Sequence, residues 1–194
     1  MEPDEVRGLV TAAAGGDGAA WKAIVERFSG LVWAITRGYR LDAADAADVF
    51  QTTWLRLAEH LDRITNPERV GAWLATTARR ESLRVARATP RTVLADDTAL
   101  VGAGYVDHQT PEQAVLDAEQ AMLDSERARQ VWRAFRKLSA SCQQLLRVLM
   151  AVPPPSYAEV AAALDMPIGS IGPSRARCLD RLRQLLTGDV SAPL

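Results

Sequence analysis

Cysteine, histidine and aromatic residues are scarce in this chain of 194 residues. His60 and His108 stand far apart, and Cys142 and Cys178 form no CxxC pair, so we expect no metal site. The two cysteines are open to two interpretations, a redox pair or two buried free thiols. Because both lie on apolar faces of predicted helices, free thiols are the favoured interpretation.

Long apolar runs and enzyme motifs are also missing. No run approaches the roughly 18 apolar residues of a membrane span, and the N-terminus does not resemble a signal peptide. The glycine-rich segment 15–18 lacks the Gly-Lys-Ser/Thr ending and the preceding strand of a phosphate loop. No nucleophile-elbow, zinc-hydrolase, dinucleotide or kinase motif is found. We therefore expect a cytoplasmic protein without membrane insertion, and no enzyme, cofactor or small-molecule substrate.

The residues that are abundant favour helices. Hydrophobic residues make up 48% of the chain, aromatic residues only 6%, and β-branched runs are rare. This composition predicts an all-α fold, and the length suits one large domain or two small ones.

Charge is unevenly distributed although the formal net charge is only −1. Residues 1–90 carry 12 basic and 12 acidic groups, residues 91–128 carry 2 and 8, and residues 129–194 carry 9 and 4. An acidic middle followed by a basic C-terminal third is typical of a nucleic-acid-binding end joined to another module.

The basic end contains a predicted pair of helices within residues 156–186, SYAEVAAALDMPIGSIGPSRARCLDRLRQLL. Ser156 and Glu159 form a capping box for the first helix, and the Asp-Met-Pro segment 165–167 ends it. The second helix is predicted to start near Ser170 as N-cap, with Pro173 in its first turn. This pattern predicts either a DNA-binding helix-turn-helix or an ordinary pair of helices with a solvated basic face.

Four helices are predicted before the middle segment, over residues 4–14, 19–39, 42–61 and 71–88, with a polar loop at 62–73. Asp17 and Asp42 are candidate N-caps. In the last of these helices Arg80, Arg84 and Arg87 share a face beside Ser82. We call these three arginines the arginine ridge; it is interpreted either as a solvated face or as a DNA contact.

The middle segment, residues 89–112, has no sustained periodicity and is predicted to be a flexible acidic linker. Helices are predicted to resume over residues 111–137, with Thr110 as cap, and from Ser139 until the prolines at 153–155.

Five segments together cover most of residues 15–88 and 130–186. In order they are GDGAAWKAIVERF, DAADAADVFQTTWLRL, AWLATTARRESLRVAR, LSASCQQLLRVLM and the predicted helix pair. In order and spacing they resemble the extracytoplasmic-function (group IV) branch of the sigma-70 family of bacterial transcription initiation factors. The resemblance implies a sigma region 2 bundle at 1–88, a linker at 89–112, a sigma region 4 unit of four helices at 113–187 and a tail at 188–194.

The resemblance also implies partners and binding residues. The partners are core RNA polymerase, through its beta and beta-prime subunits, promoter DNA and, as in many members of the family, an anti-sigma factor. Core polymerase would be bound by Asp45, Asp48, Val49, Gln51, Thr52 and Trp54. The −10 element would be recognised and melted by Arg63, Asn66, Arg69, Arg79, Arg80, Ser82, Arg84 and Arg87. The −35 element would be contacted by Ser156, Tyr157, Ser170, Gly172, Pro173, Ser174, Arg175, Arg177 and Arg181.

The sequence departs from the family pattern in three places. The family has Thr-Val-Lys/Arg-Ser-Arg where this chain has residues 170–174, so Gly172 and Ser174 replace its two base-reading cations. Either Arg175 and Arg177 take over the contacts, or the −35 element is read through backbone amides and DNA shape. The segment 72–87 has Ala-Arg-Arg-Glu-x-x-Arg in place of Ala-Arg-Asn-x-x-x-Asp, and three prolines replace an acidic-glycine turn. The competing hypothesis is a one-component helix-turn-helix regulator with an N-terminal sensor or dimerisation domain.

Overall fold

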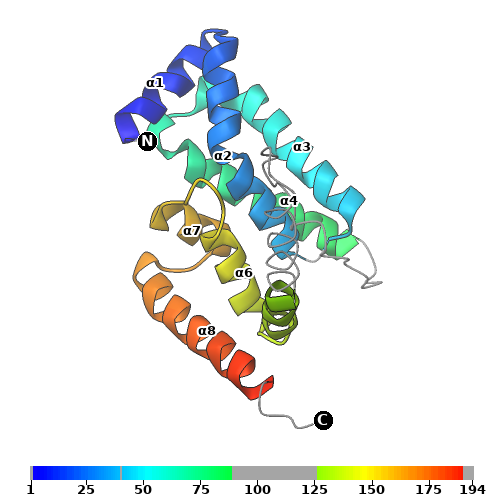
Figure 1. The fold of residues 1–194 in the computed structure, drawn as a ribbon. Helices are drawn as coiled ribbons and strands as arrows, with labels where there is room; N and C mark the ends of the chain where they lie inside the picture. Colours follow the sequence, from blue (N-terminus) through cyan, green and yellow to red (C-terminus); the bar gives the residue numbers. More distant parts are fainter. Residues whose placement is uncertain (1, 40, 89–125, 190–194) are drawn as a thin grey trace, which may run out of the picture. The chain divides into compact units, whose positions relative to one another are not determined.

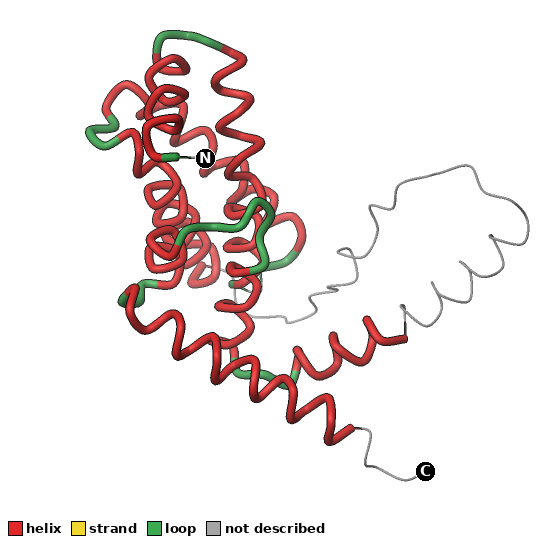
Figure 2. The backbone as a smooth tube through the Cα atoms, turned by 60° about the vertical axis from the view of Figure 1, so that its left-hand side comes forward, coloured by secondary structure: helices red, strands yellow, loops and turns green. Residues whose placement is uncertain are grey.

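The computed structural model describes residues 2–39, 41–88 and 126–189. Within these residues the chain consists of helices and the turns between them, and no strand occurs (Figure 2). The prediction of an all-α fold is confirmed. The predicted linker at 89–112 and the Thr110 cap lie outside the described residues.

The N-terminal part contains α1 (Pro3–Ala14), α2 (Gly18–Gly38), α3 (Ala43–His60) and α4 (Val70–Ala88), shown in Figure 1. Two short 3-10 turns, η1 (Leu61–Arg63) and η2 (Pro67–Arg69), connect α3 to α4. Both expected caps are confirmed. The Asp17 carboxylate accepts from the backbone N–H groups of Ala19 and Ala20, and that of Asp42 accepts from Asp45.

The core of this part lies where α2, α3 and α4 face one another. Ile24, Phe28 and Leu31 of α2 are buried. Leu57 of α3 and Leu74 of α4 are also fully buried. These positions follow the three- and four-residue spacing of an apolar helical stripe, so hydrophobic burial holds the helices together.

The C-terminal part contains a helix at residues 126–136, then α6 (Ala140–Leu149), α7 (Tyr157–Leu164) and α8 (Ile168–Asp189). The Ser139 hydroxyl accepts from the Cys142 N–H at 3.3 Å, so Ser139 opens α6 as predicted. The capping box of α7 is confirmed in both directions: Ser156 Oγ accepts from the Glu159 N–H, and Glu159 Oε2 accepts from the Ser156 N–H at 2.7 Å.

The contacts divide the chain into two compact units. One contains the described residues up to 88 together with Gln144–Arg175, and the other contains the described residues 126–143 with those from Ala176 onward. Within the first unit, α7 packs against α4 (Figure 1). The boundaries predicted from the sequence, at residues 88 and 113, stay a prediction.

Two local predictions are corrected. α8 begins at Ile168, so Ser170 is not its N-cap and Pro173 lies inside the helix rather than in its first turn. The Ser170 hydroxyl donates to the carbonyl oxygen of Pro167 at 2.7 Å instead of capping the helix. Asp165 takes a left-handed conformation with φ 56°, which ends α7 and turns the chain early enough for α8 to start before Ser170.

The prediction of free thiols is wrong: Cys142 and Cys178 form a disulfide, with Cα atoms 5.4 Å apart. It joins α6 to α8 within the second unit. The sequence suggested free thiols because each cysteine occupies an apolar helical position, but those two positions face each other. In the described ranges, every helix is too short or too polar to span a lipid bilayer.

Reduction of this disulfide is expected to destabilise the C-terminal helices. The bond closes a loop with a sequence separation of 36 residues, and the chain-entropy relation gives a loss of about 3–4 kcal/mol on opening it. Urea unfolding followed by circular dichroism, with and without dithiothreitol, measures the loss. A Cys142→Ser/Cys178→Ser variant should not respond to the reductant, and equal midpoints for the parent under both conditions would contradict the expectation.

Candidate functional site

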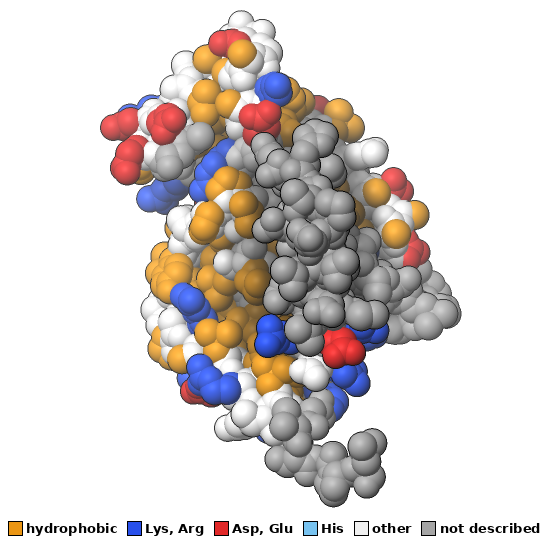
Figure 3. Space-filling view, viewed as in Figure 1, with side chains coloured by type: hydrophobic (Ala, Val, Ile, Leu, Met, Phe, Trp, Pro, Cys, Tyr) orange, Lys and Arg blue, Asp and Glu red, His pale blue; other side chains and the backbone are white. Residues whose placement is uncertain are grey.

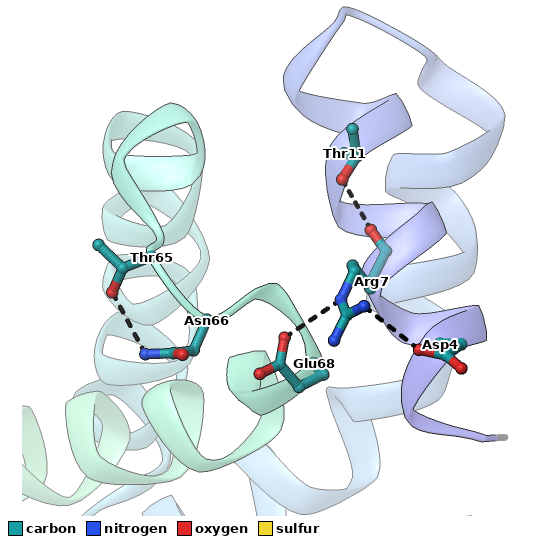
Figure 4. A network of polar contacts seen from close by, with 6 residues as sticks. All are labelled: Asp4, Arg7, Thr11, Thr65, Asn66 and Glu68. Atoms are coloured by element: carbon teal, nitrogen blue, oxygen red, sulfur yellow. Dashed lines mark hydrogen bonds and ion pairs between the residues drawn. The ribbon is translucent and has the colours of Figure 1, made fainter.

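The turn segment between α3 and α4 is held in place by α1 (Figure 4). Arg7 of α1 forms two ion pairs. Its Nε lies 3.5 Å from Oε2 of Glu68, and its Nη1 lies 3.4 Å from Oδ1 of Asp4. The pKa of Glu68 is lowered, chiefly by a hydrogen bond from its own backbone N–H and further by Arg7. The carboxylate therefore stays charged and keeps its contact with α1.

This bracing leaves the other side chains of the segment in solvent. Arg63, Asn66 and Arg69 are exposed, and the Asn66 amide donates to the Thr65 hydroxyl at 3.3 Å. Three of the eight residues expected at the −10 element therefore lie on one short exposed segment. A fixed backbone with exposed polar side chains is suited to hold an unstacked base or a phosphate.

The arginine ridge of α4 is exposed as expected, since Arg80, Arg84 and Arg87 all face solvent. Its middle member is positioned by a buried carboxylate: Glu81, whose side chain is 9% exposed, binds Arg84 Nε at 2.8 Å. The same carboxylate binds Nη2 of Arg56 on α3 at 2.9 Å. Ser82, by contrast, is fully buried. It therefore contributes no side chain to this exposed surface.

Arg79 differs from the ridge because its side chain is only 19% exposed. Its Nη1 lies 3.2 Å from Oδ2 of Asp165, in the turn between α7 and α8. Tyr39 lies near this ion pair. Burial raises the pKa of the Tyr39 hydroxyl, Arg79 opposes the shift and Asp165 adds to it. The Arg79 guanidinium is thus partly neutralised and covered by residues of the C-terminal helix pair.

The outer face of α3 borders an open cavity of about 500 Å³. Four of the six residues expected to bind polymerase line it, namely Asp45, Asp48, Gln51 and Thr52, together with Leu55, Arg84 and Val85. The other two, Val49 and Trp54, are buried in the core. These two side chains therefore pack α3 against the core and expose no surface that a partner could contact.

The residues expected at the −35 element lie on α7 and α8. Tyr157, Pro173, Arg175, Arg177 and Arg181 are exposed, whereas Gly172, Ser170 and Ser174 are half-buried. The Ser156 hydroxyl is engaged in the capping box. Arginine side chains lie along α8 in Figure 3, while acidic side chains gather at the N-terminal end of α1. The exposed cations of α8 are therefore arginines at and after position 175.

Comparison with known proteins finds a family match for the part of the chain that carries α3, α4 and the turns between them. Residues 24–92, which contain most of α2, all of α3 and α4 and the turns between them, match the family described as Sigma-70 region 2. These residues of the chain form a sigma-70 region 2. The resemblance to the extracytoplasmic-function branch of the sigma-70 family, predicted from the sequence, is confirmed.

Solved structures support this fold over nearly the whole length of the chain. Among 11 matching chains is the structure of CnrH in complex with the cytosolic domain of CnrY. It is 20% identical, with a TM-score of 0.58, and the alignment covers 95% of this chain and 99% of that one. No curated protein matches the sequence.

Sequence reasoning does not identify three residues that take part in these surfaces. Leu55 is 60% exposed beside the acidic residues of α3, Glu81 bridges two helices, and Asp165 pairs with Arg79. Leu55 could have been identified from the sequence, because an apolar residue outside the core-facing stripe of an amphipathic helix indicates a contact surface. The other two depend on contacts between segments distant in sequence.

Glu81→Gln is expected to lower the free energy of unfolding by about 1–2 kcal/mol. The buried side chain would lose its negative charge and one of its two acceptor oxygens, while the two arginines remain half in solvent and recover part of their hydration. Chemical unfolding gives the loss. Glu59→Gln, an exposed change on α3, is the matched control and should stay within about 0.5 kcal/mol of the parent. Equal losses in the two variants would contradict the bridging role.

Proposed function

We propose that this sigma factor directs promoter-specific initiation by core RNA polymerase, contacting the beta and beta-prime subunits. The cavity face of α3 binds the polymerase, and the segment 61–69 with the arginine ridge binds and opens the −10 element. α7 and α8 contact the −35 element. A protein partner of the anti-sigma type belongs to the same proposal, since CnrH is seen with the cytosolic domain of CnrY.

One observation supports the proposal most directly: the polymerase face and the ridge share a residue. Arg84 lines the α3 cavity and is also the middle member of the ridge. A protein bound at the cavity would therefore lie next to a DNA strand bound at the ridge. This arrangement suits a subunit that presents DNA to a larger enzyme.

The chemistry of each face fits its proposed partner. On α3, acidic Asp45 and Asp48 border the exposed apolar Leu55, which suits a protein surface carrying basic and apolar side chains. On α4, planar guanidinium groups suit phosphate oxygens and stack on unpaired bases. Opening a duplex needs no covalent step here, only stronger binding of the separated strand than of the duplex. Extruding a base costs a few kcal/mol, which such contacts offset.

Replacing two ridge arginines is expected to reduce initiation. Arg80→Ala/Arg87→Ala removes two exposed cations and leaves Arg84 on Glu81, so we expect run-off transcription with purified core polymerase to fall at least about tenfold. The salt dependence of DNA binding should become shallower by about 0.7 per lost single-strand phosphate contact. Lys22→Ala/Arg133→Ala removes two exposed cations outside the ridge and is the matched control.

The result that would contradict this assignment is equal transcription by the ridge variant and the control at moderate salt. Tight sequence-selective binding of the chain alone to duplex DNA, without polymerase, would instead support the one-component regulator.

Leu55→Lys is expected to weaken binding to core polymerase about tenfold or more, because an exposed apolar anchor is replaced by a charge. Fluorescence titration of labelled sigma factor with core polymerase measures the affinity. Glu59→Lys changes charge on the same helix outside the cavity lining and serves as control. Because Leu55 is exposed, its variant should unfold at the parent's urea midpoint. Unchanged affinity would remove Leu55 from the interface.

A further inference from the structure

Few side chains attach α8 to the rest of the chain by burial. Among residues 168–188, the part of α8 whose burial the structure describes, only Ile171 and Cys178 are buried. They are seven residues apart, which is about two helical turns, so they lie on the same face of the helix. Leu182 and Leu185 continue this face but are only half-buried. Cys178 is therefore the main point of attachment for the C-terminal half of α8.

Cys142, at the other end of the disulfide, lies on a firmly held part of the chain. It is in the first turn of α6, where its N–H donates to the Ser139 hydroxyl. The neighbouring Gln143 is buried, and its Nε2 donates to the carbonyl oxygens of Arg136 at 3.2 Å and Leu138 at 2.8 Å. These hydrogen bonds do not involve the disulfide. Opening the disulfide would therefore loosen α8 and leave the start of α6 in place.

The position of Cys178 links the disulfide to the basic side chains of α8. Arg175 and Arg181 lie three residues before and after Cys178, Arg177 is its direct neighbour, and all three arginines are exposed. Residues three apart differ by about 60° around a helix, so Arg175 and Arg181 flank the buried face on its two sides. A helix fixed at Cys178 holds both in one orientation. Cations that are already oriented lose less conformational freedom when they bind DNA, so the fixed helix should bind more tightly.

The surroundings of the disulfide favour a bond that opens and closes over a permanent crosslink. A subunit of bacterial RNA polymerase, as proposed above, works in the cytoplasm, where disulfides are usually transient or redox-sensing. Phe135, Leu138 and Leu146 are buried near Cys142 in sequence, so the helices there have apolar contacts that do not need the disulfide. Cys142 is half-buried, so one end of the bond borders solvent. A small thiolate can attack a disulfide sulfur that it can reach.

We propose that Cys142 and Cys178 form a redox switch for the DNA contact of α8: the closed disulfide holds the α8 arginines in position, and its reduction releases them. In closing, the two thiols pass two electrons and two protons to a small-molecule disulfide such as oxidised glutathione. The Sγ–Sγ bond forms, the bond of the small disulfide breaks, and two small thiols leave. Opening is the reverse reaction. The switch rests on the proposed function only for its consequence at the −35 element.

The chemistry of the switch is tested on the full chain in glutathione buffers that range from mostly reduced to mostly oxidised. Alkylation and peptide mass spectrometry give the fraction of chains with the disulfide, which should be low in the first buffer and high in the last. Hydrogen exchange on the same samples should be several-fold faster after reduction in α8 peptides beyond Cys178, and unchanged in α6. A disulfide that stays closed in reduced glutathione, or an equal exchange rate of α8 in both states, would overturn the proposal.

DNA binding is then measured by fluorescence anisotropy with a labelled duplex of mixed sequence at low salt. The oxidised chain should bind about fivefold more tightly than the chain treated with dithiothreitol, because its arginines are already oriented. Re-oxidation should restore the tighter binding. Cys142→Ser/Cys178→Ser is the matched control: it should bind like the reduced parent and should not respond to dithiothreitol.

Two pairs of substitutions test whether the effect comes from α8. Arg175→Ala/Arg181→Ala should bind the duplex weakly in both redox states, so that the difference between the states disappears. Arg80→Ala/Arg87→Ala removes the same number of exposed arginines from α4 and should keep the full ratio between oxidised and reduced chains. A ratio that survives the loss of the two α8 arginines would contradict the proposal.

Equal binding of the duplex by oxidised and reduced chains would overturn the proposal. Binding that re-oxidation does not restore would contradict it too, because this result indicates unfolding rather than a switch. If binding follows the redox state but neither form supports run-off transcription with core polymerase, the proposed function fails. The switch would then still be established for the DNA contact of α8.

Discussion

The packing of α4 against three other helices is the constraint on which the rest of this structure depends. α4 contacts α2, α3 and α7, and its buried positions are mostly small residues, including Gly71, Ala75 and Ala78. Small side chains let neighbouring helices approach closely, so little room is left for α4 to shift without losing contacts. The ridge on its outer side and the covered Arg79 both take their positions from this packing.

Features that depend on neighbouring residues could be predicted from the sequence. The caps at Asp17 and Asp42 and the box at Ser156 and Glu159 need only a side chain and the backbone two or three residues away. The four-residue spacing of Arg80 and Arg84 likewise places them together on one face. The same periodicity shows why Ser82 does not join them: a residue two positions from each arginine points to the opposite side of the helix.

Features that depend on distant segments could not be predicted in this way. The disulfide joins residues 36 apart. Gly30 of α2 lies against Val152, between α6 and α7, and no local signal in the sequence encodes the pairing of these two segments. The start of α8 was misplaced for a different reason. Ser170 and Pro173 form an N-terminal signal, but the left-handed Asp165 turns the chain sooner. Pro173 is exposed, so water can bind the backbone carbonyl that its missing N–H leaves without a donor.

The Glu81 carboxylate affects the energies of the two arginines that it binds as well as their positions. It holds Arg56 on one helix and Arg84 on the next, so a phosphate that draws Arg84 away leaves more of its negative charge on Arg56. If a protein bound on α3 changed the affinity for a nucleic acid at Arg84 by some factor, thermodynamic linkage would require the nucleic acid to change the affinity for that protein by the same factor. One buried acid thus makes two separate surfaces energetically dependent on each other.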